Sequence, residues 1–127
     1  MTTGFTFKKE ERLCSLKTIG RLFTEGKSFY LFPIRVVYLL IDQESKFPVQ
    51  AAFSVSKKNI RKASARNLLR RRMKEVYRQN KPVMNVPQIG KGLVVMFVYT
   101  AREILDFGDI EKSMKLATSR LSRIINS

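Results

Sequence analysis

The sequence has no histidine and a single cysteine, Cys14. Histidine is the commonest general base and the commonest metal-binding side chain. The residue most often used in acid–base and metal catalysis is therefore absent. One cysteine cannot form a disulfide within the chain, which fits a reducing compartment, and it cannot complete a zinc site of the usual kind. We therefore expect no catalytic residue, no metal site and no cofactor in the protein itself.

Acidic residues and long apolar runs are also scarce. The 10 acidic residues are scattered, without a carboxylate pair that suggests a metal-dependent nuclease. Neither G-x-G-x-x-G nor G-x-x-x-x-G-K-[ST] occurs. The longest apolar runs, near residues 36–41 and 93–98, have the length of strands, and the N-terminus lacks the pattern of a signal peptide. We expect a cytoplasmic protein with no membrane partner and no small-molecule substrate.

Positive charge is abundant and concentrated. The 25 lysines and arginines give the 127 residues a formal charge of +15. Glu75 is the only acid between residues 57 and 81, a segment that carries these basic residues: Lys57, Lys58, Arg61, Lys62, Arg66, Arg70, Arg71, Arg72, Lys74, Arg78 and Lys81. Such a concentration predicts a polyanionic partner, either nucleic acid or an anionic membrane surface, and of the two we expect nucleic acid. A merely solvated surface usually mixes both signs.

Apolar periodicity and turn residues predict one α+β domain over residues 1–127. Residues 1–14 form an N-terminal arm, and helices are expected at 15–25, 64–78 and 106–126. Strands are expected at 27–32, 34–41, 49–56 and 92–99, the last buried on both faces, with turns or loops at 42–48 and 80–92. The result is an α/β sandwich of order α-β-β-β-α-β-α with a mixed four-stranded sheet.

Within the first helix, Leu16, Ile19 and Phe23 share a face, Ser15 is a candidate N-cap and Gly26 is expected to end the helix in a left-handed conformation. The last helix is expected to be capped by Asp106 or Asp109. Its apolar positions follow helical spacing: Ile110, Met114, Ala117, Leu121 and Ile124.

The central helix is predicted to have a core face and a cationic face. Ser64 is its candidate N-cap, and the core face comprises Ala65, Leu69, Met73, Val76 and Tyr77. Arg66, Arg70 and Lys74 form a row beside it, which Asn67, Arg71 and Arg78 extend. Guanidinium groups offer forked donors to phosphate, whereas Asn67 is either a base or sugar contact or an ordinary surface residue.

A second candidate surface is apolar. Ile19, Phe23 and Tyr38 either line a groove for unstacked bases or belong to the core. Along residues 52–56 the side chains alternate, so Phe53 and Val55 are expected in the core. The opposite face, with Ser54 at its centre, stays small and leaves room for a ligand.

Two motifs carry a family resemblance. The segment Ser54-Val55-Ser56-Lys57-Lys58, followed by the helix of residues 63–75 with Arg66-Asn67, resembles the protein subunit of bacterial ribonuclease P. Arg12-Leu13, Phe23 and Gly26 match its N-terminal pattern. The chain departs from the family at three places: Leu68 replaces the second arginine of Arg-Asn-Arg, one extra residue lies between Lys58 and Ala63 with Arg61 in place of glycine, and Ile19 replaces an aromatic residue.

The resemblance implies a ribosomal protein S5 domain 2-like fold with a left-handed β-α-β crossover. It also implies a catalytic RNA partner that holds Mg²⁺ and removes the 5′ leader from precursor tRNA, so the protein alone would not be catalytic. The implied RNA-binding residues are Arg66, Asn67, Arg70, Arg71, Lys74, Lys57, Lys58 and Lys62. The implied leader cleft comprises Ile19, Phe23, Tyr38 and Ser54.

Two other classes of function remain open from the sequence. A structural RNA-binding protein, similar to a ribosomal protein, would bind RNA without favouring a leader-bearing tRNA over mature tRNA. A DNA-binding module could place the basic helix in a major groove, but neither a clear helix-turn-helix nor a dimerisation element is recognisable.

Overall fold

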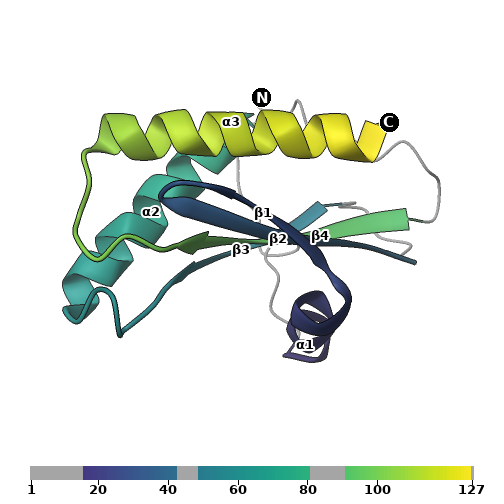
Figure 1. The fold of residues 1–127 in the computed structure, drawn as a ribbon, viewed down its shortest axis with the longest axis horizontal. Helices are drawn as coiled ribbons and strands as arrows, with labels where there is room; N and C mark the ends of the chain where they lie inside the picture. The colour runs from purple at the N-terminus through teal and green to yellow at the C-terminus, as the bar shows by residue number, and fades with distance from the viewer. Residues whose placement is uncertain (1–15, 43–48, 81–90, 127) are drawn as a thin grey trace, which may run out of the picture.

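The protein is described by a computed structural model in which residues 16–42, 49–80 and 91–126 are placed (Figure 1). The elements follow the predicted order: α1 (Leu16–Glu25), β1 (Lys27–Leu31), β2 (Ile34–Asp42), β3 (Val49–Val55), α2 (Ala63–Asn80), β4 (Lys91–Tyr99) and α3 (Phe107–Asn126). The predicted N-terminal arm, the Ser15 cap, and most of the 42–48 turn and the 80–92 loop lie outside the described residues. No helix in the described ranges is long and apolar enough to cross a membrane.

The four strands form one mixed sheet in the order β1-β2-β4-β3. β2 pairs with β1 and β4 in antiparallel fashion, whereas β3 and β4 run parallel and are joined through α2. In Figure 1, α2 and α3 cover one face of the sheet and α1 lies on the other. The fold is therefore the α+β arrangement that the sequence predicted. The crossover through α2 connects β3 to β4, its neighbour in the sheet.

Alternation along the strands builds a core on each face of the sheet. On the α2 and α3 side, Phe53 and Phe97 stack at a centroid distance of 5.6 Å, and Tyr77 from α2 lies 5.6 Å from Phe97. Val94 and Met96 of β4 face α1 instead. Most positions of the predicted helix stripes are confirmed as buried: Leu69, Met73, Val76 and Tyr77 in α2, and Ile110, Met114, Ala117 and Leu121 in α3. Ala65 and Ile124, at the ends of the stripes, are half-buried.

The face that α1 buries differs from the prediction. Leu22 is fully buried and Ile19 is half-buried, but Phe23 is 57% exposed. Gly26 does not adopt the predicted left-handed conformation. Its amide donates to the carbonyl of Leu22 at 2.9 Å, and a Cβ at Gly26 would collide with that carbonyl and approach the Tyr38 carbonyl to 2.9 Å. Glycine is needed here because the helix end lies directly against β2, and this contact turns Leu22 inward.

The structure also identifies the residue at the N-cap position of each of the two long helices. The Arg66 amide donates to the Lys62 carbonyl at 3.1 Å, so Lys62 occupies the N-cap position and the predicted cap, Ser64, lies inside α2. For α3 the prediction is confirmed at Asp106, whose carbonyl accepts the amides of Asp109 and Ile110 at 3.1 and 3.2 Å. α2 therefore begins next to a lysine and α3 next to an aspartate.

Candidate RNA-binding surface

The predicted RNA-binding residues lie on two consecutive segments, the β3–α2 loop and the first three turns of α2. Lys57, Lys58 and Lys62 are exposed on the loop. On α2, Asn67 and Arg71 are exposed, whereas Arg66, Arg70 and Lys74 are half-buried beside the core stripe. All eight predicted residues therefore lie on one continuous stretch of chain that is exposed or half-buried apart from Ile60 and the core stripe of α2.

The electrostatics at this end oppose the helix dipole. The N-terminus of a helix carries a partial positive charge and favours acidic side chains or bound anions. The first turn of α2 contains no acid, and Arg61 and Lys62 come immediately before it. The cations therefore add to the positive end of the dipole, at a cost in stability that a bound phosphate group would offset.

Asn67 and Arg70 act as one unit. The Arg70 Nη2 donates to the Asn67 Oδ1 at 2.5 Å, so the amide oxygen of Asn67 is already engaged. The remaining polar group of Asn67 is its NH₂, which can only donate. The pair therefore presents mainly donors, the Asn67 NH₂ and the other N–H groups of Arg70, which suit phosphate or sugar oxygens.

The far end of α2 and its α3-facing flank are engaged within the protein. Glu75 accepts a 2.6 Å bond from Arg78 Nη2, and this bond lowers the pKa of the Glu75 carboxyl. Arg72 Nη1 donates to the Leu105 carbonyl at 3.3 Å, which ties α2 to the loop before α3. Leu68, four residues before Arg72, is half-buried on this flank, so its departure from the family motif does not interrupt the row of Arg66, Arg70 and Lys74.

The predicted apolar groove is only partly assembled. Ile19 packs on the α1 side of the sheet with Val37 and Val94, and Ser54 faces the same side because it is paired with Val98. Phe23 is exposed on α1, so its alternative assignment to the core is wrong.

Tyr38 must be removed from this groove. It packs on the opposite face of the sheet, where its ring lies 6.0 Å from that of Phe29. Strand alternation explains the error, because an even-numbered position of β2 cannot share a face with Val37. A groove over the α1 side can therefore use Ile19, Phe23 and Ser54 but not the Tyr38 side chain.

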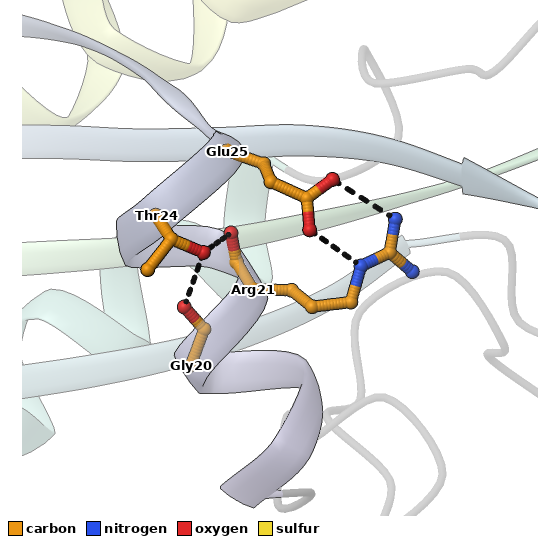
Figure 2. A network of polar contacts seen from close by, with 4 residues as sticks. All are labelled: Gly20, Arg21, Thr24 and Glu25. Carbon is orange, nitrogen blue, oxygen red and sulfur yellow. Dashed lines mark hydrogen bonds and ion pairs between the residues drawn. The ribbon is translucent and has the colours of Figure 1, made fainter.

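The polar side of α1 has its own contacts (Figure 2). Arg21 Nε donates to Glu25 Oε2 at 3.0 Å, and the Thr24 hydroxyl donates to the Gly20 carbonyl at 3.1 Å. The Arg21 guanidinium holds the pKa of the Glu25 carboxyl below its ordinary value. Arg21 is thereby largely neutralised, so α1 differs from α2 in offering an aromatic side chain rather than a run of positive charge.

A separate hollow of about 460 Å³ lies between the β1–β2 turn and α3. Its walls include Phe32, Leu105 and Leu116, and its charged residues are Asp109 and Lys112. One cation and one carboxylate, both on α3, give this hollow no net attraction for a polyanion. Among the described residues there is no group of three or more histidine, cysteine, aspartate or glutamate side chains that could hold a metal ion.

Comparison with known proteins gives one consistent family. The family model named Ribonuclease P matches residues 7–122. The ribonuclease P protein component of Porphyromonas gingivalis is 33% identical over 126 residues, covering 96% of this chain and 92% of that protein. The corresponding component of Chlorobium phaeobacteroides is 39% identical over 79 residues, covering 60% of this chain and 54% of that protein.

Solved structures with the same fold carry the same family name. The RNase P protein of Staphylococcus aureus superposes with a TM-score of 0.69 at 20% identity, covering 93% of this chain and 100% of that one. The RNase P protein of Thermotoga maritima gives 0.68 at 24% identity, covering 87% and 96%. At these identities the superpositions establish the fold, and the relation by sequence rests on the family match.

Proposed function

The chain belongs to the ribonuclease P protein family, which implies a role in ribonuclease P and tRNA processing, and on this premise we propose that it is the protein subunit of a ribonucleoprotein endoribonuclease. It binds the catalytic RNA and the 5′ leader of precursor tRNA in the cytoplasm. The RNA performs the Mg²⁺-dependent hydrolysis that releases the leader and leaves a mature tRNA 5′ end. The protein alone does not cleave.

The observation that carries this proposal is the run of exposed or half-buried cations from Lys57 to Lys74, on the β3–α2 loop and the first three turns of α2, with no acid among them. Lysine and arginine side chains bind the phosphate backbone by neutralising it and releasing counterions. Mg²⁺ takes oxygen ligands, above all carboxylates and waters, and this surface offers ammonium and guanidinium groups instead. The catalytic metal therefore belongs to the RNA, and the protein's contribution is to bind and to orient.

The α1 side of the sheet is the proposed place for the leader. Phe23 is a large exposed aromatic ring, and base–aromatic stacking tolerates any sequence because every base has a π-face. Ser54 keeps β3 small on the same side of the sheet. An unpaired leader strand could therefore lie across β3 with a base against Phe23.

Reconstitution tests the proposal directly. The purified protein should cleave nothing, but with the catalytic RNA of its own organism it should lower the Mg²⁺ concentration needed for cleavage and tighten binding of precursor tRNA. If neither quantity changes when the protein is added, the proposal is wrong.

A matched pair of phenylalanines tests the leader site. Phe23 and Phe32 are 57% and 61% exposed, on α1 and at the β1–β2 turn respectively. Phe23→Ala should weaken binding of leader-bearing tRNA about tenfold relative to mature tRNA, the loss expected for one stacked base. Phe32→Ala should leave that ratio unchanged. Equal effects of the two substitutions would remove Phe23 from the leader site.

The second candidate is a structural RNA-binding protein without a role in tRNA processing. It rests on the same cationic surface and makes one different prediction: precursor and mature tRNA should bind equally, with or without the catalytic RNA. A titration of both tRNAs against the reconstituted complex separates the two functions.

A further inference from the structure

The loop between β3 and α2 has a fixed path, although it carries four cations. Its Ile60 side chain is buried, and the Ile60 amide donates to the Ser56 carbonyl at 3.0 Å. The Lys58 amide donates to the Ser56 hydroxyl at 3.1 Å, and the Asn59 amide group donates to the Thr100 carbonyl at 3.2 Å. These contacts hold the middle of the loop against the end of β4.

The last two residues before the helix are held by Arg66. Its Nη1 donates to the Ile60 carbonyl at 2.9 Å and to the Arg61 carbonyl at 2.7 Å. One guanidinium nitrogen on the first turn of α2 thus holds two successive carbonyls of the loop that leads into it. The hydrogen-bonding capacity of Arg66 is therefore directed at the protein backbone as well as at solvent.

We propose that Arg66 is a positioning residue, which fixes the β3–α2 loop so that Lys57, Lys58, Arg61 and Lys62 meet RNA phosphates together. This inference rests on the proposed function for the identity of the ligand. Four like charges on a short loop repel one another, and a loop that is ordered before binding loses less conformational entropy when RNA arrives. Without Arg66 the same four cations remain, but the Ile60 and Arg61 carbonyls lose the bonds that fix the end of the loop, and the cations are no longer held in one arrangement.

Hydrogen exchange of the full-length protein without RNA tests the first half of this proposal. In Arg66→Ala, the amides of Lys58 and Ile60 should exchange at least about tenfold faster, because bonds from a charged donor are among the stronger local contacts. Core amides such as that of Val95 should not change. Arg70→Ala is the matched control, since it removes the same charge from the same helix but releases only Asn67. Equal loop exchange in the two variants would overturn the proposal.

Should Arg66→Ala fail to fold, the charge-preserving pair Arg66→Lys and Arg70→Lys makes the same comparison. Faster exchange of the loop amides is then expected for Arg66→Lys only, because an ammonium group lacks the planar fork of the guanidinium. Equal exchange in these two variants would again overturn the proposal.

A double-mutant cycle on affinity for the catalytic RNA tests the second half. Replacing Lys57 and Lys58 together by alanine should weaken binding about 30-fold in the otherwise wild-type protein, and less than about fivefold when Arg66 is already alanine. Additive losses would mean that Arg66 is an independent phosphate contact and would overturn the positioning role. If the wild-type protein bound no RNA, the proposed function would fail, while the exchange comparison would still decide whether Arg66 holds the loop.

Discussion

The two long helices, α2 and α3, cover the same face of the sheet and bury similar apolar stripes, yet the charges on their exposed surfaces are distributed differently. α3 has Asp106 before its first turn, Asp109 within it and Arg123 in its last turn, so its charges complement the helix dipole. It also pairs Lys115 with Glu111 at 3.8 Å. α2 has six cations and one acid, and its N-terminus lacks any acid.

This difference separates the requirements of folding from those of binding. Both helices are attached by apolar stripes, so neither needs its surface charge in order to pack. The surface of α3 has the pattern that stabilises a helix by itself, whereas α2 has a pattern that lowers helix stability and favours a polyanion. Residues that reduce local stability without a packing reason are a physical sign of a binding surface.

The largest effects should come from the shared feature, the buried stripes. Leu69→Asp in α2 and Met114→Asp in α3 each place an unpaired carboxylate among fully buried side chains. Each should cost at least about 4 kcal/mol of unfolding free energy and abolish or greatly weaken cooperative unfolding, as measured by circular dichroism during heating. A cooperative transition near the wild-type midpoint in either variant would show that its helix is not anchored as described.

The next largest effect should be on RNA binding, and it should differ between α2 and α3. Replacing Arg70, Arg71 and Lys74 together by alanine should weaken binding to the catalytic RNA about 100-fold and lower the salt slope by about two units. The matched triple on α3, Lys112, Lys115 and Arg123 to alanine, removes the same formal charge and should change binding less than about threefold if local contact decides. Similar losses in both triples would mean that net charge alone drives binding.

At the start of α2, a single substitution should raise the stability of the fold and weaken RNA binding. Lys62→Asp puts an acidic N-cap at the positive end of the dipole and should raise the unfolding free energy by about 0.5–1 kcal/mol. The same change should weaken RNA binding about tenfold, because it replaces a cation by an anion on the binding surface. The reverse change on α3, Asp106→Lys, should lower stability and leave RNA affinity unaltered. For the wild type and both variants, chemical denaturation measures the unfolding free energy and a titration with RNA measures the affinity.

The smallest effect concerns the one acid of α2. Because Arg78 lowers the pKa of Glu75 below its ordinary value of 4.5, the ionised pair stabilises the fold above that pH, and the contribution is lost as pH falls through the lowered pKa. Glu75→Gln should remove a small step from the pH dependence of stability below about pH 4.5. At neutral pH it should tighten RNA binding less than about threefold, and Glu111→Gln on α3 should not tighten it at all.

Much of the fold and of the cationic surface could be predicted from the sequence because both depend on local patterns. Helical spacing identified Leu69, Met73 and Val76 as core positions, and charge counting located the cationic segment between Lys57 and Lys74. The apolar groove was harder to predict. α1 is ten residues long and has apolar residues at positions compatible with two faces. Its close contact with β2 at Gly26, which periodicity does not reveal, selected Leu22 over Phe23.

By itself, the sequence determined the order of helices and strands, the buried stripes and the length of chain that carries positive charge, because these follow from the spacing of side chains along one element. Only the tertiary structure decided that Tyr38 lies on the face away from α1, that Lys62 rather than Ser64 caps α2, and that Arg66 holds the loop before it. These depend on which backbone hydrogen bond begins the helix, or on the direction in which a side chain leaves its strand or helix. The position of a residue along the chain does not specify either.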